Sequence, residues 1–298
     1  NLLKTLTISP NNKNFKYLDK THQIIIGKSD KNSEDYDVLV FANRDIETAT
    51  IPASIKRIAS FAFENCKHLI QLTIQDNSKL QTIRKRAFSF TSIEKITIPK
   101  SVEIIEESSF IYCESLKEVL IEKGSKLKSI SNRLFFNCSS LEKVEIPENS
   151  ELKSIGKNVF FNSSIKSIYI PSFVENLEDG WISNAQCLKS ITISSNNKNF
   201  KYEDEEHQII IGKSDKNSEY FDVLVFANRN IKNIKIPYYI KHISSFAFGN
   251  CRKLTKIEIP ENSNLQSIGK CAFSKTLIET INFTTNVETL DDDWCNNA

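Results

Sequence analysis

Residues 93–115 read IEKITIPKSVEIIEESSFIYCES, and this stretch decides the fold because its pattern recurs along the whole chain. Apolar residues stand at its first, fourth and sixth positions, which is the alternation of a β-strand with one buried face. Pro99 marks the end of the strand because proline lacks the N–H that a sheet ladder needs. Phe110 and Cys113 follow in a return segment that turns and places an aromatic ring inside. We interpret the stretch as one coil of a repeating structure.

The strand pattern occurs eleven times in 298 residues, at steps of 23 to 25 residues with two longer steps of 43. Its copies begin at Leu3, Ile46, Leu69, Ile93, Leu116, Leu141, Ile165, Leu188, Ile231, Leu254 and Ile278. A unit of this length cannot bury its own apolar face, so neighbouring units must stack. The sequence therefore predicts one curved, right-handed solenoid over 1–298, with about eleven repeats and a parallel sheet on its concave face. We expect the array to continue beyond residue 298.

Two nearly identical segments explain the long steps. Residues 11–47 and 196–232 agree at 30 of 37 positions. Each holds two apolar stretches separated by the turn-rich sequence KSDKNSE, which is typical of a β-hairpin. The predicted insertions lie near 11–45 and 196–230, with hairpins that stand off the solenoid near 22–42 and 207–227.

The repeat resembles that of the BspA-like leucine-rich repeat family, which reads roughly L-x-x-I-x-I-P-x-S-V-x-x-I-x-x-x-A-F-x-x-C. Pro99–Val102, Ile105, Phe110 and Cys113 follow this pattern, and Asn11–Phe15 is similar to the N-N-x-x-F/Y insertion between repeats of that family. The resemblance extends over essentially the whole chain. The chain departs from the pattern at a few places, namely Thr91, Ser163, Trp181, Thr276 and Trp294. The resemblance implies a leucine-rich-repeat solenoid from a cell-surface or secreted protein of mucosal bacteria or protist parasites, associated with adhesion to host cells or matrix.

Composition argues against several function classes. Lys and Arg number 39 against 37 Asp and Glu, and both signs are interspersed, so no basic face for nucleic acid is predicted. The sequence contains no run of about 18 apolar residues, so we expect no membrane insertion within this segment. No GxGxxG or GxxxxGK[ST] motif is present. Catalysis needs a unique asymmetric pocket, whereas repeated coils make many similar grooves, so we expect no enzyme activity and no cofactor.

Four of the seven cysteines and four of the asparagines follow the repeat. Cys66, Cys113, Cys138 and Cys251 share one column, and we expect buried free thiols there. Cys113 and Cys138 lie on adjacent coils, so a disulfide between them stays open. Neither CxxC nor CxxH spacing occurs, so the sequence predicts no metal site. A parallel column of asparagines, Asn65, Asn137, Asn162 and Asn250, is expected to hydrogen-bond turn backbone from coil to coil.

A ligand-binding patch is predicted where the outward positions of the strands are not small and polar. The residue between the last two apolar positions of each strand must face outward. On three consecutive coils this residue is Leu120, Glu145 and Tyr169, and an exposed aromatic among polar neighbours is typical of a protein interface. The residues one pleat away complete the predicted patch: Glu118, Lys143 and Ser167. Solvated sheet residues, with binding by the hairpins or edges, are the alternative.

The leading functional hypothesis is a non-enzymatic cell-surface or extracellular module that binds a protein ligand and mediates adhesion. An intracellular protein-interaction scaffold with the same fold is the alternative, and a structural coat protein without a specific ligand is a third reading, because fold does not settle function. The predicted core comprises Leu72, Ile74, Ile96, Ile98, Val144, Ile146, Ile168, Ile170, Phe63, Phe110, Phe135, Phe160 and Phe248.

Overall fold

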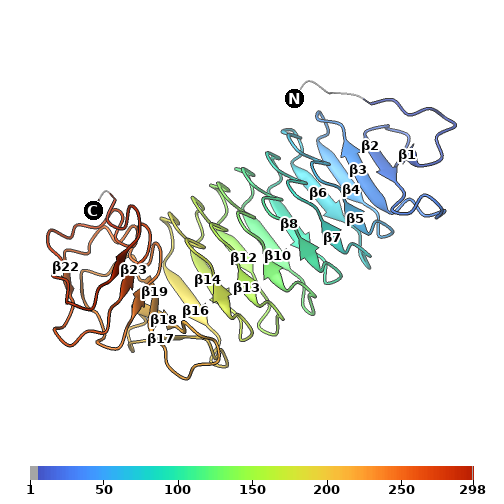
Figure 1. Cartoon of the computed structure of the whole chain (residues 1–298). Coiled ribbons are helices and arrows are strands. Elements are labelled where there is room, and N and C mark those ends of the chain that lie inside the picture. Colours follow the sequence, from blue (N-terminus) through green and yellow to red (C-terminus); the bar gives the residue numbers. More distant parts are fainter. Residues whose placement is uncertain (1–5, 297) are drawn as a thin grey trace.

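The computed structural model describes residues 6–296 and residue 298, and the chain forms a β-solenoid of about eleven turns whose first and last coils lie at opposite ends (Figure 1). No helix occurs within the described residues. The first side of each coil is a strand of the predicted pattern. These strands are β4 (Thr48–Ile51), β6 (Gln71–Ile74), β8 (Lys95–Ile98), β10 (Glu118–Ile121), β12 (Lys143–Glu145), β14 (Ser167–Ile170), β16 (Ser190–Ile193), β20 (Asn233–Lys235) and β22 (Lys256–Glu258).

Pairing along this side is parallel, as predicted. Side chains alternate, so one face of each strand enters the core and the other forms an open surface, which we call the sheet face. Nine of the eleven predicted strands are present. The other two were expected at 3–8 and 278–283. Residues 1–5 lie outside the described residues, and residues 6–8 and 278–283 adopt no strand.

A second parallel column of two-residue strands, which the sequence did not predict, runs along the return side of the coils. It contains β5 (Arg57–Ile58), β7 (Thr82–Ile83), β9 (Ile104–Ile105), β11 (Ser129–Ile130), β13 (Ser154–Ile155), β15 (Asn176–Leu177), β21 (His242–Ile243), β23 (Ser267–Ile268) and β24 (Thr289–Leu290). The apolar residue of most of these pairs is buried, as at Ile58 and Ile155. Strand pairing therefore joins successive coils on two sides, although neither column is paired without interruption.

The insertions form antiparallel strands, but the prediction that they stand off the solenoid is not confirmed. The first contains β1 (Phe15–Tyr17), β2 (Ile24–Gly27) and β3 (Val38–Ala42), and the second contains β17 (Phe200–Tyr202), β18 (Ile209–Gly212) and β19 (Val223–Ala227). In each, the last strand pairs in parallel with the second column, β3 with β5 and β19 with β21. The apolar runs such as Ile24–Ile26 are buried on both faces of this sheet. This burial explains why the insertion strands extend the second column instead of projecting into solvent.

A buried aromatic stack runs through the return turns. Phe63, Phe88, Phe110, Phe135 and Phe160 lie one above the other with ring centroids 5.0 to 5.9 Å apart. Phe248 and Phe273 continue the arrangement in the second half at 5.1 Å. Eleven of the thirteen predicted core residues are buried, and the exceptions, Leu72 and Ile74, are half-buried.

The asparagine column has a different role from the predicted one. Asn65, Asn137, Asn162 and Asn250 all have φ between 55° and 65°, in the left-handed region that asparagine tolerates better than most residues. The Oδ1 atoms of Asn137 and Asn250 have no hydrogen-bond partner. Asparagine is therefore placed here by backbone conformation. Backbone groups form the hydrogen bonds between the turns of successive coils, and the Asn65 N–H, for example, donates to the Ser89 carbonyl at 2.9 Å.

Candidate functional site

Three of the six residues of the predicted patch, Glu118, Lys143 and Glu145, belong to a ladder of charges across the sheet face. Lys95 Nζ lies 2.8 Å from Glu118 Oε2, and Lys143 Nζ lies 3.0 Å from Glu118 Oε1. Lys143 also forms an ion pair with Glu145. Hydrogen bonds from Lys95 and Lys143 lower the pKa of Glu118. The carboxylates and ammonium groups therefore hold one another in place on strands β8, β10 and β12.

The outward residues of the predicted patch lie where the alternation places them. Leu120 is paired in register with Thr97 on one side and Glu145 on the other. Tyr169 is paired with Thr192 on the next strand. Leu120 and Tyr169 are both half-buried, whereas Glu145 is exposed. The patch is therefore a mixed apolar and charged area on the sheet face.

The sheet face is not continuous. Strand β4 pairs with β6, β10 joins β8 and β12, and β14 pairs with β16. Among the described residues, no strand ladder joins β6 to β8 or β12 to β14. Single backbone hydrogen bonds bridge the starts of these strands, from Glu94 to Ile70 at 3.4 Å and from Lys166 to Glu142 at 3.1 Å.

Each break follows a return turn that is one residue short. Ile93 follows Phe88 by five residues and Ile165 follows Phe160 by five, whereas Leu69 follows Phe63 by six. In these short turns a hydroxyl residue, Thr91 or Ser163, replaces the cysteine. Thr91 Oγ1 donates to the Phe88 carbonyl at 3.0 Å, and Ser163 Oγ makes the same bond to Phe160 at 2.9 Å. One residue supplies up to about 3.5 Å of chain, so its loss draws the next strand out of the ladder.

The third short turn supports this explanation. Ile278 follows Phe273 by five residues, and Thr276 stands in the cysteine position. Thr276 Oγ1 donates to the Phe273 carbonyl at 2.9 Å, like its counterparts. Residues 278–283, which follow, form no strand at all. A short turn therefore precedes each break in the strand pairing of the sheet face, before β8, before β14 and at residues 278–283. The breaks made by the insertions themselves are not included.

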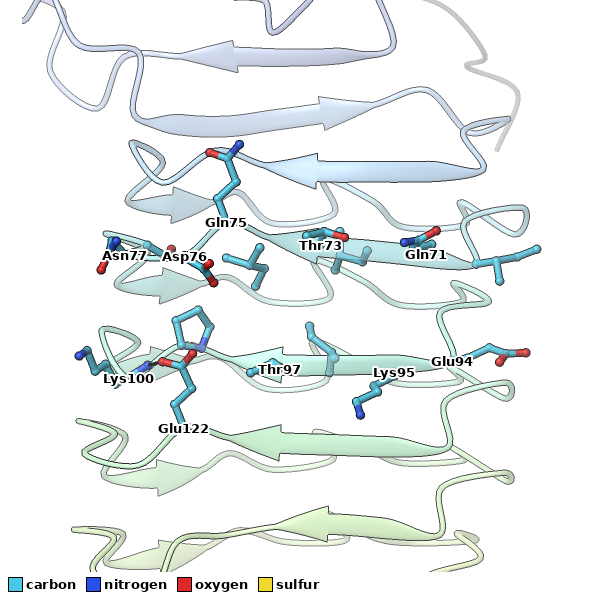
Figure 2. Close-up of a pocket in the computed structure, with 16 residues that line it drawn as sticks. Gln71, Thr73, Gln75, Asp76, Asn77, Glu94, Lys95, Thr97, Lys100 and Glu122 are labelled. Atoms are coloured by element: carbon cyan, nitrogen blue, oxygen red, sulfur yellow. Dashed lines mark hydrogen bonds between the residues drawn. The ribbon is translucent and has the colours of Figure 1, made fainter.

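A hollow of about 650 Å³ lies at the first break, between β6 and β8, and we call it the β6/β8 hollow (Figure 2). Figure 2 shows these two strands farther apart than β8 and β10. Its floor is apolar, with Leu72 and Ile74 half-buried instead of buried. Its rim carries three acids and two lysines, namely Asp76, Glu94, Glu122, Lys95 and Lys100. The sequence interpretation missed this hollow, although the five-residue spacing from Phe88 to Ile93 signalled it.

A second hollow of about 410 Å³ lies at the break between β12 and β14, the β12/β14 hollow. Four of the six predicted patch residues line it: Lys143, Glu145, Ser167 and Tyr169. Leu120 and Glu118 lie beside it on β10. The structure thus brings the predicted residues together around a depression that the alternation of the strands could not reveal.

The cysteine column is buried as predicted. Cys66, Cys113, Cys138 and Cys251 are free, buried thiols. Cys113 Sγ donates to the Phe88 carbonyl at 3.0 Å, and Cys138 Sγ donates to the Phe110 carbonyl at 3.1 Å. Burial raises the pKa of Cys66, Cys138 and Cys251, which keeps the unreactive thiol form.

Native thiol labelling is expected to separate the cysteines into two groups. Cys187 and Cys295 are exposed and react at once with a thiol reagent, whereas the four column cysteines react only after unfolding. Cys271, which is half-buried, reacts at an intermediate rate. Mass spectrometry of labelled peptides checks the assignment. Fast native labelling of Cys113 or Cys138 would contradict a buried column.

The histidines and acidic turns of the insertions have local partners. No group of three or more His, Cys, Asp or Glu side chains within the described residues is arranged to hold a metal ion. His22 and His207 stack on Tyr17 and Tyr202, with centroids 4.2 and 3.8 Å apart. Asp30 accepts a hydrogen bond from the Asn32 amide at 2.9 Å, as in a simple polar turn. Within the part of the chain that the structure describes, no helix is long and apolar enough to cross a membrane.

Solved structures with the same architecture come from bacterial proteins. A leucine rich cell surface protein from Faecalibacterium prausnitzii A2-165 has a TM-score of 0.66 at 22% identity, over 88% of this chain and 75% of that protein. The pneumococcal vaccine antigen PcpA has a TM-score of 0.57 at 22% identity, over 82% of this chain and 58% of PcpA. These similarities show a shared fold. A search of curated proteins finds no match.

The repeats themselves match a described family. The BspA type leucine rich repeat region matches in six copies, over residues 34–149, 120–204 and 216–297. These ranges include both parallel columns and the aromatic stack of the solenoid. Together with the coil geometry, they show that the chain belongs to the BspA type leucine rich repeat family.

Proposed function

We propose that this chain is a non-enzymatic module that binds a protein ligand on its sheet face, as part of a cell-surface or secreted protein that attaches to host cells or matrix. The family and the fold are consistent with protein binding. The similar protein from F. prausnitzii is described as a cell surface protein, and PcpA is described as a vaccine antigen. Both descriptions support a location at the cell surface.

The β12/β14 hollow is the single observation that carries the proposal. It combines a half-buried Tyr169 with Lys143 and Glu145 at a place where the strand ladder is broken. An aromatic ring that a partner can desolvate, surrounded by polar groups, is the arrangement in which interface energy concentrates. The charge ladder from Lys95 to Glu145 would then orient the partner, because charged rims contribute mainly specificity and association rate.

The β6/β8 hollow supplies a second contact area on the same sheet face. It offers the apolar side chains of Leu72 and Ile74 with a rim of both charges. A ligand that spans β6 to β14 would contact both hollows and the row of polar residues between them. A protein surface fits this length and mixed character better than a small molecule does.

The double variant Tyr169→Ala, Glu145→Lys is expected to weaken attachment at least tenfold. This corresponds to a loss of about 1.4 kcal/mol in binding free energy. The change removes the aromatic ring and reverses one charge while leaving core positions untouched. Attachment is measured on immobilised extracellular-matrix proteins and on cultured epithelial cells, with circular dichroism to verify folding.

The matched control is Tyr238→Ala with Glu258→Lys. Tyr238 is an exposed tyrosine, and Glu258 occupies the same strand position as Glu145 and pairs with Lys235 at 2.9 Å. This control makes the same two substitutions away from the hollows and should attach like the wild type. Unchanged attachment by the folded Tyr169 variant would remove the β12/β14 hollow from the proposal.

A further inference from the structure

A third hollow, of about 450 Å³, lies where β19 and β21 begin in the second column, and we call it the lateral hollow. No residue that lines the β6/β8 hollow or the β12/β14 hollow lines this one. Its volume is typical of a small-molecule site. The lateral hollow is therefore separate from the sheet face and has its own chemistry.

The internal duplication provides a counterpart for every residue of the lateral hollow, 185 residues earlier in the chain. Five of the nine lining residues are identical in the two copies, and they belong to the strands and to the charged pair at their start. Lys201, Ile211, Glu219, Asp222 and Lys241 correspond to Lys16, Ile26, Glu34, Asp37 and Lys56. The two copies thus share the same framework at this place.

The other four lining residues differ between the copies. Tyr220, Phe221, Tyr239 and Asn264 stand where the first copy has Asp35, Tyr36, Ser54 and Lys79. These replacements remove one negative and one positive charge and add two aromatic rings. The second copy therefore has a more aromatic and less charged hollow than the same framework carries in the first copy.

The three aromatic side chains of the lateral hollow are held to different degrees. Phe221 and Tyr239 are half-buried and pack against the core of the second half. Lys201 Nζ lies 4.6 Å from the centroid of the Phe221 ring. Tyr220, in contrast, is 80% exposed. Two rings are therefore fixed in the lining, and the ring of Tyr220 has little packing of its own to lose when it contacts a ligand.

A fifth difference between the copies involves the partner of Tyr239. Glu203 stands where the first copy has Leu18, so an acid appears together with the tyrosine that replaces Ser54. Burial and a hydrogen bond with Glu203 raise the pKa of Tyr239 above its ordinary value. The phenol therefore stays protonated and its ring is held from both ends.

The charges around the lateral hollow balance one another. Lys201 and Lys241 line it together with Glu219 and Asp222. Lys241 Nζ lies 3.6 Å from Asp222 Oδ2, so this pair is neutralised within the protein. Such a hollow gives little net attraction to either an anion or a cation, and an uncharged ligand fits it best.

The rim offers hydrogen-bonding groups that the protein does not use. Among the described residues, the side chains of Glu219, Tyr220 and Asn264 form no hydrogen bond with another part of the chain. They supply a carboxylate acceptor, a hydroxyl group, and an amide that both donates and accepts. Polar groups of several kinds around aromatic rings suit a ligand with many hydroxyl groups and apolar C–H faces.

The strand pairing disfavours a peptide in this place. The strands beside the lateral hollow are β18, β19 and β21, and each is paired on both sides. An extended peptide binds by adding to an unpaired strand edge, and these strands offer none. The lateral hollow must therefore recognise its ligand with side chains alone.

We propose that the lateral hollow binds a neutral saccharide of about two sugar units. The rings of Tyr220 and Tyr239 contact the C–H faces of the sugar, and Glu219 and Asn264 bind its hydroxyl groups. This site does not depend on the ligand-binding function proposed for the sheet face.

Titration with maltose, cellobiose, lactose and N-acetyllactosamine, followed by amide chemical shifts of the 298-residue chain, tests the proposal. At least one disaccharide is expected to shift amides around residues 219–222 and 239–241, with a dissociation constant on the order of 1 mM. The variant Glu203→Leu, Tyr220→Asp, Tyr239→Ser should weaken this binding at least tenfold. It should remain folded, because the first copy carries the same three residues on the same framework.

The reverse exchange tests whether the differing residues create the site. Leu18→Glu, Asp35→Tyr, Tyr36→Phe, Ser54→Tyr and Lys79→Asn together give the first copy the residues of the second. The same disaccharide should then also shift amides around residues 34–37 and 54–56, which it leaves unchanged in the wild type. Shifts confined to the second copy would contradict the assignment of binding to these positions.

Two controls separate this site from its surroundings. Tyr238→Ala removes a tyrosine that is 56% exposed beside Tyr239 but does not line the hollow, and this variant should bind like the wild type. The Tyr169→Ala, Glu145→Lys variant, changed only on the sheet face, should also keep full saccharide binding. A wild type that binds none of the four disaccharides up to about 20 mM would overturn the proposal, even if an aromatic peptide shifted the same amides. That result would leave the attachment assay of the sheet face unaffected.

Discussion

Replacing Phe135 with alanine is expected to lower the free energy of unfolding by about 3–5 kcal/mol. The ring is 2% exposed and lies between Phe110 and Phe160, with centroids 5.7 and 5.9 Å away. Its removal leaves a cavity that neighbours on both sides cannot fill, because every coil of the stack is fixed by its own hydrogen bonds. Urea unfolding followed by circular dichroism measures the loss.

Two further variants place this result in context. Phe248→Ala removes the corresponding ring of the second half, which stacks on Phe273 at 5.1 Å, and should cost a similar amount. Phe173→Ala is the matched control, because this ring is 58% exposed and its loss should change stability by less than about 0.5 kcal/mol. A loss below about 1 kcal/mol for Phe135→Ala would show that the phenyl ring is not part of the core.

Replacing Asp37 with alanine is expected to cost about 1.5–3 kcal/mol at neutral pH, since hydrogen bonds to a buried charge are lost. Its carboxylate accepts the Ser29 amide at 2.9 Å and the Ser29 hydroxyl at 2.8 Å, and it lies 3.3 Å from Lys56 Nζ. These contacts close the long loop of the first insertion. Asp222 makes the same bonds to Ser214, so Asp222→Ala should behave alike.

The pH dependence of this effect identifies the charge as its source. Burial alone would raise the pKa of Asp37, but the hydrogen bonds from Ser29 and Lys56 outweigh it and lower the pKa below its ordinary value. A lowered folded-state pKa means that the stabilisation is complete above the unfolded pKa and is lost as the pH falls through the folded one. The difference between wild type and Asp37→Ala should therefore shrink below about pH 4.

The control for this experiment is Asp35→Ala, an exposed carboxylate in the same loop, which should leave stability unchanged at both pH values. Unfolding curves at pH 7 and pH 2.5 provide the comparison. An Asp37→Ala difference of equal size at both pH values would show that packing, not the ionised carboxylate, closes the loop.

The candidate site illustrates how far the sequence alone could reach. Alternation along each strand correctly placed Leu120, Glu145 and Tyr169 on the sheet face, because the direction of a side chain depends only on its position within its own strand. The hollow that gathers Glu145 and Tyr169 depends on the distance between β12 and β14. That distance follows from the short turn at Ser163, whose effect appears only when successive coils are stacked.

By itself, the sequence determined the repeating coil, the aromatic stack and the buried cysteine column. Each of these depends on a spacing that recurs from Phe63 to Phe273, and stacking identical spacings brings identical residues together. Only the tertiary structure decided where strand pairing on the sheet face is interrupted and that the insertion strands extend the second column. It also decided that Phe15 is exposed while Phe200 is buried. The physical reason is that these features depend on what lies next to a coil, and two nearly identical segments of sequence can have different neighbours.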